Sequence, residues 1–238
     1  MYTFNSRVRY SETDSKARLS LEGIVNYLQD CSTFHSEDVG LGLNYHKGIN
    51  RAWLLASWQI VIDRYPKMGE RITIWTNPYD HDKLYAYRNF AILSESGEIL
   101  IKANSIWVYV DTLNNKPVRV KDEDITSYMA NPKIAKLEMD YAPRKFKIPK
   151  DGTEMEKIEV MSHHLDTNRH VNNGQYVRFA CEYLPDDVMI REIRAEYRTA
   201  AKLGNIIVPR VSLTKRGCVV ALGDEEGNSK YAAVEFIF

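Results

Sequence analysis

The chain passes twice through the same order of predicted elements, one amphipathic helix followed by several long strands. In the first pass Ser20 is placed to cap the helix, because its side-chain oxygen can accept the first unpaired backbone N–H groups. The apolar stripe of this helix consists of Leu21, Ile24, Val25, Leu28 and Cys31. Aromatic and β-branched runs then predict strands at 53–63, 71–77, 84–93 and 100–110, with turns at 67–70, 78–80 and 96–97. A helix followed by a strand meander indicates an α+β unit.

The second pass is shorter and repeats this order. Asn172 and Asn173 predict a helix start, and Pro185 stops a helix that runs to about Tyr183. Its apolar face consists of Val177, Ala180, Cys181 and Leu184. Strands are predicted at 188–199, 205–214, 218–222 and 230–238. The chain therefore carries two copies of one helix-and-sheet unit.

Short matches between the two halves support the duplication. Lys67-Met68-Gly69 matches Lys202-Leu203-Gly204, Gly97 matches Gly227, and Glu12-Thr13-Asp14 matches Asp166-Thr167-Asn168. The order of the matches is kept while their spacing shrinks, as expected for a shorter second copy. We expect an N-terminal domain at 1–120, a proline-flanked linker at 121–155 and a C-terminal domain at 156–238.

The composition excludes several classes of protein. Of the 238 residues 44% are hydrophobic, which is enough for a sizeable core. Lys and Arg together number 32, as do Asp and Glu, so no net field favours nucleic acid or an anionic membrane. No apolar run is long enough to span a bilayer and the first residues carry no apolar signal core. We therefore expect a cytoplasmic protein without membrane insertion.

Candidate site residues lie just before the second helix. Asp166, Asn168 and His170 occupy alternate positions, so in an extended backbone their side chains would point the same way, toward the positive end of the helix. A histidine can accept a proton from water near neutral pH, and backbone N–H groups at 172–174 could polarise a carbonyl. We therefore place the chemistry at this junction between the loop and the helix.

The same stretch resembles a known family. Asp166 to Asn173, followed by Tyr176 and by Glu196-Tyr197-Arg198, is similar to the acyl-ACP thioesterases of plants and bacteria. Further similarity covers 53–66 with Gly69, Gly97-Glu98 and 105–108, and so extends over nearly the whole chain. The resemblance implies a tandem (double) hotdog fold of the α+β class, in which each copy is a helix wrapped by a curved antiparallel sheet.

The resemblance also implies an activity: hydrolysis of fatty acyl-ACP thioesters to free fatty acid and carrier thiol, with no metal or organic cofactor. His170 would activate water, Asn168 would hold water or substrate, and Asp166 would orient one of the other two. The N-terminal copy has no histidine in its matching loop, so it would shape the acyl pocket. The partner would be an acyl carrier protein, and a homodimer is left open.

One departure from the family lies directly after Glu196-Tyr197-Arg198. Plant members continue Glu-Tyr-Arg with Arg-Glu-Cys, whereas this chain continues with Thr199-Ala200-Ala201. A cysteine nucleophile at that place is excluded, and Cys181 lies about 16 Å along the helix from His170. Glu196 would share a strand face with Ala200 and is predicted to substitute as a catalytic group. A structural role for Glu196, or a reduced activity, fits the sequence as well.

Other interpretations stay open. His163, His164, Asp166 and His170 could be metal ligands. The chain could be an acyl-CoA thioesterase, a dehydratase or an acyl-binding protein without catalysis, the last favoured by the two alanines. Basic residues could dock the acidic carrier protein, because such contacts raise association rates. These residues are Arg144, Lys145, Lys147, Arg191, Arg194 and Arg198. Acyl chain length cannot be predicted from these features.

Overall fold

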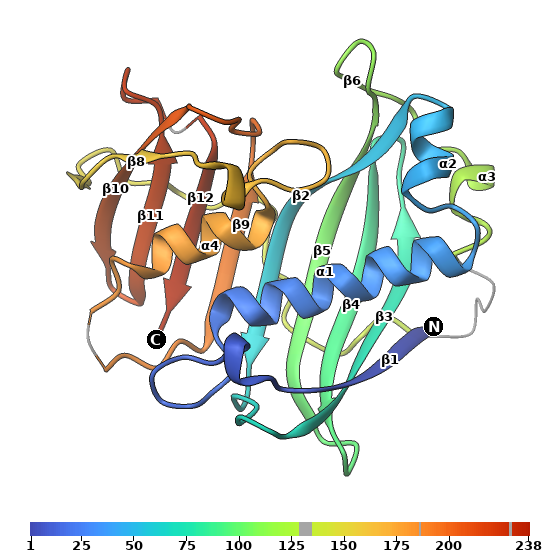
Figure 1. Cartoon of the computed structure of the whole chain (residues 1–238), viewed down its shortest axis with the longest axis horizontal. Coiled ribbons are helices and arrows are strands. Elements are labelled where there is room, and N and C mark those ends of the chain that lie inside the picture. Colours follow the sequence, from blue (N-terminus) through green and yellow to red (C-terminus); the bar gives the residue numbers. More distant parts are fainter. Residues whose placement is uncertain (129–134, 186, 229) are drawn as a thin grey trace. The chain divides into compact units, whose positions relative to one another are not determined.

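Figure 1 shows a computed structural model of the chain, which describes residues 1–128, 135–185, 187–228 and 230–238. The chain divides into two compact units. The first consists of Met1–Ala56 and Ile62–Tyr141, and the second of Ser57–Val61 and Ala142–Phe238. In each unit a helix lies across one face of an antiparallel sheet (Figure 1). Within the described ranges, no helix has the length and apolar character needed to cross a membrane.

The first unit contains the longer helix. Its sheet order is β1 (Tyr2–Arg7), β3 (Arg71–His81), β4 (Tyr85–Ser94) and β5 (Ile99–Asp111), with β6 (Lys116–Pro117) against β5. Strand β2 (Arg51–Ile62) gives its residues 57–61 to the second unit. The helices are α1 (Leu21–Asp38), α2 (Leu43–Gly48) and α3 (Asp122–Ile125), with a 3₁₀ turn at Tyr10–Glu12.

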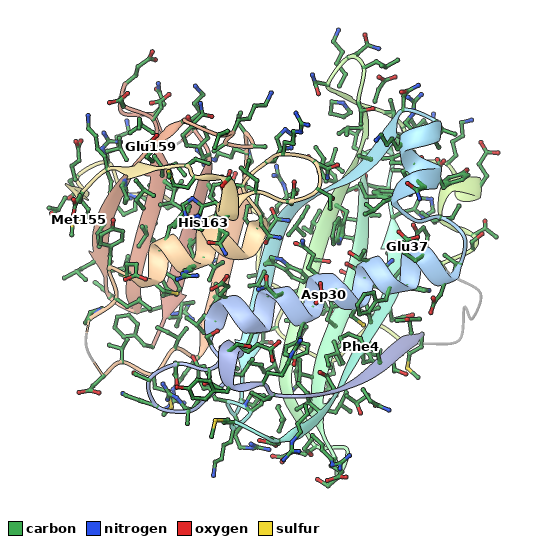
Figure 2. The ribbon with its side chains drawn as sticks, in the orientation of Figure 1. Phe4, Asp30, Glu37, Met155, Glu159 and His163 are labelled. Atoms are coloured by element: carbon green, nitrogen blue, oxygen red, sulfur yellow. The ribbon has the colours of Figure 1, made fainter. Side chains whose placement is uncertain are left out.

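Helix α1 begins where the sequence predicts. Ser20 caps it, because its Oγ accepts the N–H of Gly23 at 3.0 Å. Ile24, Val25, Leu28 and Cys31 of the predicted stripe are fully buried. Phe4 of β1, labelled in Figure 2, packs edge-on against Phe34 with the ring centres 5.2 Å apart. The predicted amphipathic helix is therefore confirmed as the core helix of its unit.

The second unit repeats this arrangement with shorter elements. Its sheet order is residues 57–61 of β2, β9 (Glu192–Tyr197), β12 (Ala232–Ile237), β11 (Gly217–Gly223), β10 (Ile206–Thr214) and β7 (Thr153–Glu154). Strand β8 (Ile158–Glu159) also pairs with β10, and a 3₁₀ turn at Ser162–His164 precedes α4 (Asn173–Cys181). Strand β11 is buried along its whole length. The predicted linker thus holds α3 and β7 as well as irregular chain.

One predicted turn is wrong. Residues 78–80 continue β3, which reaches His81 through a β-bulge between Pro78 and Asp80. A bulge tolerates proline because it interrupts the ladder of hydrogen bonds that proline cannot donate to. The chain reverses at Asp82 instead, whose carboxylate accepts the N–H groups of Leu84 and Tyr85.

Two of the three matches between the halves have the same geometry in both units. Gly69 and Gly204 have left-handed φ angles of 79° and 75°, and their N–H groups donate to Val8 and Val160 respectively, both at 2.9 Å. Gly97 and Gly227 also have positive φ angles, of 84° and 91°. These turns are therefore repeated features, as the sequence predicts.

Candidate functional site

The loop before α4 is a tight turn and not an extended segment. The N–H of Asp166 donates to the carbonyl of His170 at 2.7 Å, and Arg169 takes a left-handed φ of 59°. A bridge between Leu165 and Val171 closes the loop. The prediction that alternation places three side chains on one face is therefore wrong.

The carboxylate of Asp166 causes this turn. Its Oδ1 accepts the backbone N–H of Asn168 at 2.8 Å and of His170 at 3.2 Å. An aspartate that bonds the backbone two residues on competes with extended structure, and this explains the error. Asp166 thus holds the other two candidates through their backbones. In this loop Asn168 is exposed, whereas Asp166 and His170 are half-buried.

Helix α4 follows the loop directly. Asn172 is its N-cap, since its Oδ1 accepts the N–H of Gly174 at 2.8 Å, which confirms the predicted start. The N–H of Asn172 itself donates to His164. Two of the three amides predicted to polarise a carbonyl are therefore already bonded, and the electrostatic contribution left is that of the positive helix end.

The inner face of α4 is wider than predicted. Val177 and Ala180 are buried as expected, and so are Tyr176 and Phe179. The helix ends at Cys181, so Leu184 lies beyond it.

Tyr176 connects α4 to the segment that carries the two alanines. Its hydroxyl accepts the N–H of Ala201 at 2.8 Å, and the carbonyl of Ala201 accepts the N–H of Val171 at 2.9 Å. The segment is therefore fixed next to the residue that follows His170. No structural role was predicted for Tyr176, although an aromatic residue with a polar tip on a buried helix face favours a hydrogen bond of this kind.

We expect Tyr176→Phe to lower the free energy of unfolding by about 1–3 kcal/mol, because the buried N–H of Ala201 loses its acceptor. Urea unfolding of the wild type and the variant measures this. Tyr10→Phe is the matched control, since Tyr10 is 83% exposed. Equal midpoints for all three proteins would show that the hydrogen bond between Tyr176 and Ala201 contributes nothing to stability.

Glu196 lies apart from the loop. Tyr197, its neighbour on β9, donates its hydroxyl hydrogen to the carbonyl of Asn173 at 3.1 Å, so Tyr197 is on the α4 face and Glu196 is on the opposite one. The Glu196 side chain is buried and accepts from Arg198 at 3.3 and 3.4 Å. Within the part of the chain that the structure describes, no hydrogen bond joins Glu196 to Asp166, Asn168 or His170.

The prediction that Glu196 shares a strand face with Ala200 is wrong. Strand β9 ends at Tyr197, so the predicted strand at 188–199 is too long and its alternation does not reach Ala200. Ala200 itself is exposed, next to Ala201, whose N–H is bonded to the Tyr176 hydroxyl.

The first unit contains the same loop without a histidine. The N–H of Asp14 donates to the carbonyl of Arg18 at 2.7 Å, and Asp14 Oδ1 accepts the N–H groups of Lys16 and Arg18, both at 2.9 Å. Ala17 takes the left-handed φ, 55°, that Arg169 has in the second unit. Asp14 therefore matches Asp166, and the predicted match of 12–14 with 166–168 is wrong, because it aligned residue types and not the turn.

Arg18 occupies the place of His170 in this first loop. Its guanidinium pairs with Asp14 at 2.9 and 3.1 Å and lies over the ring of Tyr65 at 4.8 Å. An arginine stays protonated and cannot act as a base near neutral pH. Only the second of the two matching loops can therefore supply a base.

The proposed metal ligands have other contacts. His164 Nδ1 accepts the N–H of Met161 at 3.0 Å, and its ring packs edge-on against Phe179. Burial, then His163 and Arg178, hold the pKa of His164 below its usual value. His163, labelled in Figure 2, precedes it in the 3₁₀ turn. No group of three or more His, Cys, Asp or Glu among the described residues has the geometry to hold a metal ion.

Two of the basic residues considered for carrier docking are engaged within their own unit. Arg194 pairs with Glu235 at 2.8 Å, donates to the carbonyl of Pro143 and lies over the ring of Phe146. Arg198 pairs with Glu196. Lys145, Lys147 and Arg191 are exposed and remain candidates for such a surface.

A helix across an antiparallel sheet, present twice, with an Asp-Asn-His loop before one helix, defines the class: this is a tandem hotdog protein, and the predicted fold class is confirmed. Residues 1–128 match the acyl-ACP thioesterase N-terminal domain, and 147–232 match the acyl-ACP thioesterase C-terminal domain. The chain therefore belongs to the acyl-ACP thioesterase family.

Two plant relatives agree with this assignment. The chain is 24% identical over 218 residues to an acyl-[acyl-carrier-protein] hydrolase, chloroplastic, of Cuphea viscosissima, covering 84% of this chain and 51% of that protein. It is 24% identical over 228 residues to a palmitoyl-acyl carrier protein thioesterase, chloroplastic, of Arabidopsis thaliana, covering 90% and 55%. The chain thus spans about half the length of the curated relatives it matches.

Solved structures show the same fold. An acyl-ACP thioesterase from Bacteroides thetaiotaomicron superposes with a TM-score of 0.88 at 20% identity, covering 99% of this chain and 96% of that one. The 12:0-ACP thioesterase from Umbellularia californica superposes with a TM-score of 0.81 at 19% identity, covering 99% and 96%.

Proposed function

We propose that this protein hydrolyses fatty acyl-ACP thioesters to free fatty acid and carrier thiol, as a thioester hydrolase of fatty acid biosynthesis. The observation that carries the proposal is the loop at 166–170, which holds a histidine directly before the positive end of α4. The family match and the names of the relatives support acyl-ACP as the substrate. A cytoplasmic location stays a prediction; the named plant relatives are chloroplastic.

His170 is the general base in the proposed reaction. Its imidazole takes a proton from water, and the water oxygen attacks the thioester carbonyl carbon. The tetrahedral intermediate carries an oxyanion, which the positive end of α4 and the side-chain amide of the exposed Asn168 stabilise. When the C–S bond breaks, the imidazolium returns the proton to the leaving thiolate. Asp166 acts by fixing the loop, and the first unit, whose loop carries Arg18, shapes the acyl pocket.

A role for Glu196 in the reaction has less support. Its carboxylate is on the sheet face opposite α4 and is paired with Arg198. Catalysis would then proceed with His170 and no second carboxylate, which predicts a slower enzyme than one with a glutamate at position 200.

We expect Ala200→Glu to raise kcat by at least about tenfold, because it places a carboxylate beside the loop where plant members of the family have one. Ala200 is exposed, so the longer side chain can be accommodated. Steady-state thiol release from acyl-ACP measures this, with Ala200→Gln as the uncharged control. Equal rates for wild type and Ala200→Glu, or equal gains in both variants, would remove this explanation.

The same two alanines favour a second candidate, an acyl-binding protein that keeps the fold without catalysis. Acyl-ACP and acyl-CoA of equal acyl length, offered separately to the wild type, separate the candidates. The proposal predicts faster release of thiol from acyl-ACP. A faster reaction with CoA substrates would make the protein an acyl-CoA thioesterase, and tight binding without thiol release would make it an acyl-binding protein.

A further inference from the structure

The two units attach their matching loops by the same backbone hydrogen bond. The N–H of Val171 donates to the carbonyl of Ala201 at 2.9 Å, and the N–H of Leu19 donates to the carbonyl of Pro66 at 2.8 Å. Each donor directly follows the last residue of its loop, and each acceptor directly precedes one of the two matched runs that end in a left-handed glycine. Within each unit the loop and its attachment are therefore built alike.

Two tyrosines distinguish the second unit from this shared frame. Tyr176 stands four residues after the cap of α4, where α1 has Ile24 four residues after its own cap. Tyr197 is the last residue of β9, and Ile62 is the last residue of β2. Both isoleucines are buried, as is Tyr176. The unit that carries the histidine therefore has a hydroxyl at two positions where the other unit has only hydrocarbon.

Both hydroxyls bond to the backbone next to the loop. Tyr176 accepts the N–H of Ala201 at 2.8 Å, and Tyr197 donates to the carbonyl of Asn173, the first residue of α4, at 3.1 Å. Burial raises the pKa of Tyr176 to about 12, so its hydroxyl is neutral at physiological pH. Pro66, the counterpart of Ala201, has no N–H to offer such a bond. Because the loop of the first unit forms without these bonds, the turn itself does not require them.

His170 depends on its backbone for its position. The hydrogen bonds that it makes in the described structure are those of its N–H and its carbonyl, both with Asp166. Arg18, at the same place in the first unit, is held by its side chain, which pairs with Asp14 and lies over the ring of Tyr65. A general base must lie within hydrogen-bond reach of the water that it activates. The second loop therefore needs a support that the first does not.

We propose that Tyr176 and Tyr197 are positioning residues, which hold the loop at 166–170 against the start of α4 and so fix the place of the His170 imidazole. This inference rests on the proposed function, because it names the residues on which the assigned base depends. Both tyrosines act through backbone groups. Tyr176 acts through the peptide of Ala201, which in turn holds Val171, and Tyr197 acts through the first carbonyl of the helix.

We expect Tyr176→Phe and Tyr197→Phe each to lower kcat for acyl-ACP hydrolysis by about 10- to 100-fold, because a small displacement of the base costs about that much. KM should stay within about threefold of the wild-type value, since the lost interaction is with the protein and not with the substrate. Tyr183→Phe is the control and should keep wild-type kcat, because its hydroxyl donates to Glu156, which is outside the loop. Wild-type kcat in both test variants, or an equal loss in the control, would overturn the proposal.

Ala201→Pro removes the Tyr176 bond from its other end. Pro66 occupies the equivalent place in the first unit, so a backbone of this kind accommodates proline. We expect the same loss of kcat as in Tyr176→Phe, and no further loss when the two changes are combined, because one hydrogen bond is lost in all three proteins. The combined variant leaves no buried N–H without an acceptor. Recovery of kcat in it would assign the loss to that N–H, and additive losses would indicate two separate effects; either result would overturn the proposal.

Amide hydrogen exchange gives a readout that needs no turnover. In Tyr176→Phe the amide of Val171 should exchange faster than in the wild type, whereas Leu19, which makes the same bond without a tyrosine, and the buried strand β11 should be unchanged. If the wild type hydrolyses no acyl-ACP yet shows this local effect, the proposed function fails and the positioning of the loop stands. No change at Val171, or an equal rise throughout the second unit, would leave Tyr176 with a role in the fold alone and would overturn the proposal.

Discussion

Replacing His170 with alanine is expected to lower kcat for acyl-ACP hydrolysis by at least about 100-fold, within the usual contribution of a general base. The fold should survive, because the loop is held by backbone groups of His170 and by Asp166, not by the imidazole. Thiol release at saturating acyl-ACP measures kcat, and far-ultraviolet circular dichroism checks that the variant is folded.

His163→Ala is the matched control for this experiment. His163 is exposed, lies in the 3₁₀ turn before the loop and has no role in the proposed reaction. It should retain wild-type kcat. A His170→Ala variant that turns over at the wild-type rate would remove the histidine from the mechanism, and equal losses in both variants would indicate a general effect on the fold.

Replacing Asp166 tests whether this residue acts through charge or through the turn. We expect Asp166→Ala to lower kcat by about 100-fold, because the N–H groups of Asn168 and His170 lose their common acceptor and the loop is no longer positioned. Asp166→Asn should retain most of the activity, since an amide oxygen accepts the same two bonds. Steady-state kinetics of the two variants compare these roles.

The equivalent residue of the first unit provides the control. Asp14→Ala breaks the same kind of turn, but in a loop without a base, so it should affect stability more than kcat. If Asp166→Asn is as inactive as Asp166→Ala, the carboxylate charge acts directly on the imidazole, and Asp166 orients His170, one of the two roles that the family resemblance implies.

The elements could be predicted where local chemistry decides them. Ser20 and Asn172 cap their helices because each side chain can satisfy a backbone N–H within three residues. The repeated turns at Gly69 and Gly204 could be matched because both positions need a left-handed backbone. These features depend on neighbouring residues only, so the sequence contains the whole cause.

The site geometry could not be predicted in the same way. Alternation assumes an extended backbone, and one aspartate turned the loop at 166–170 into a tight turn. The face on which Glu196 lies depends on where β9 ends and on the contact between Tyr197 and α4. Both are set by tertiary packing and not by neighbouring residues.

The most direct test of the central claim is a single-turnover reaction with wild-type protein in excess over one acyl-ACP. Free fatty acid and carrier thiol are quantified as the reaction proceeds. Both products are expected to appear in equal amounts until all thioester is consumed, and His170→Ala is expected to leave the thioester intact over the same period. Recovery of bound but uncleaved acyl-ACP from the wild type would contradict it and would identify an acyl-binding protein.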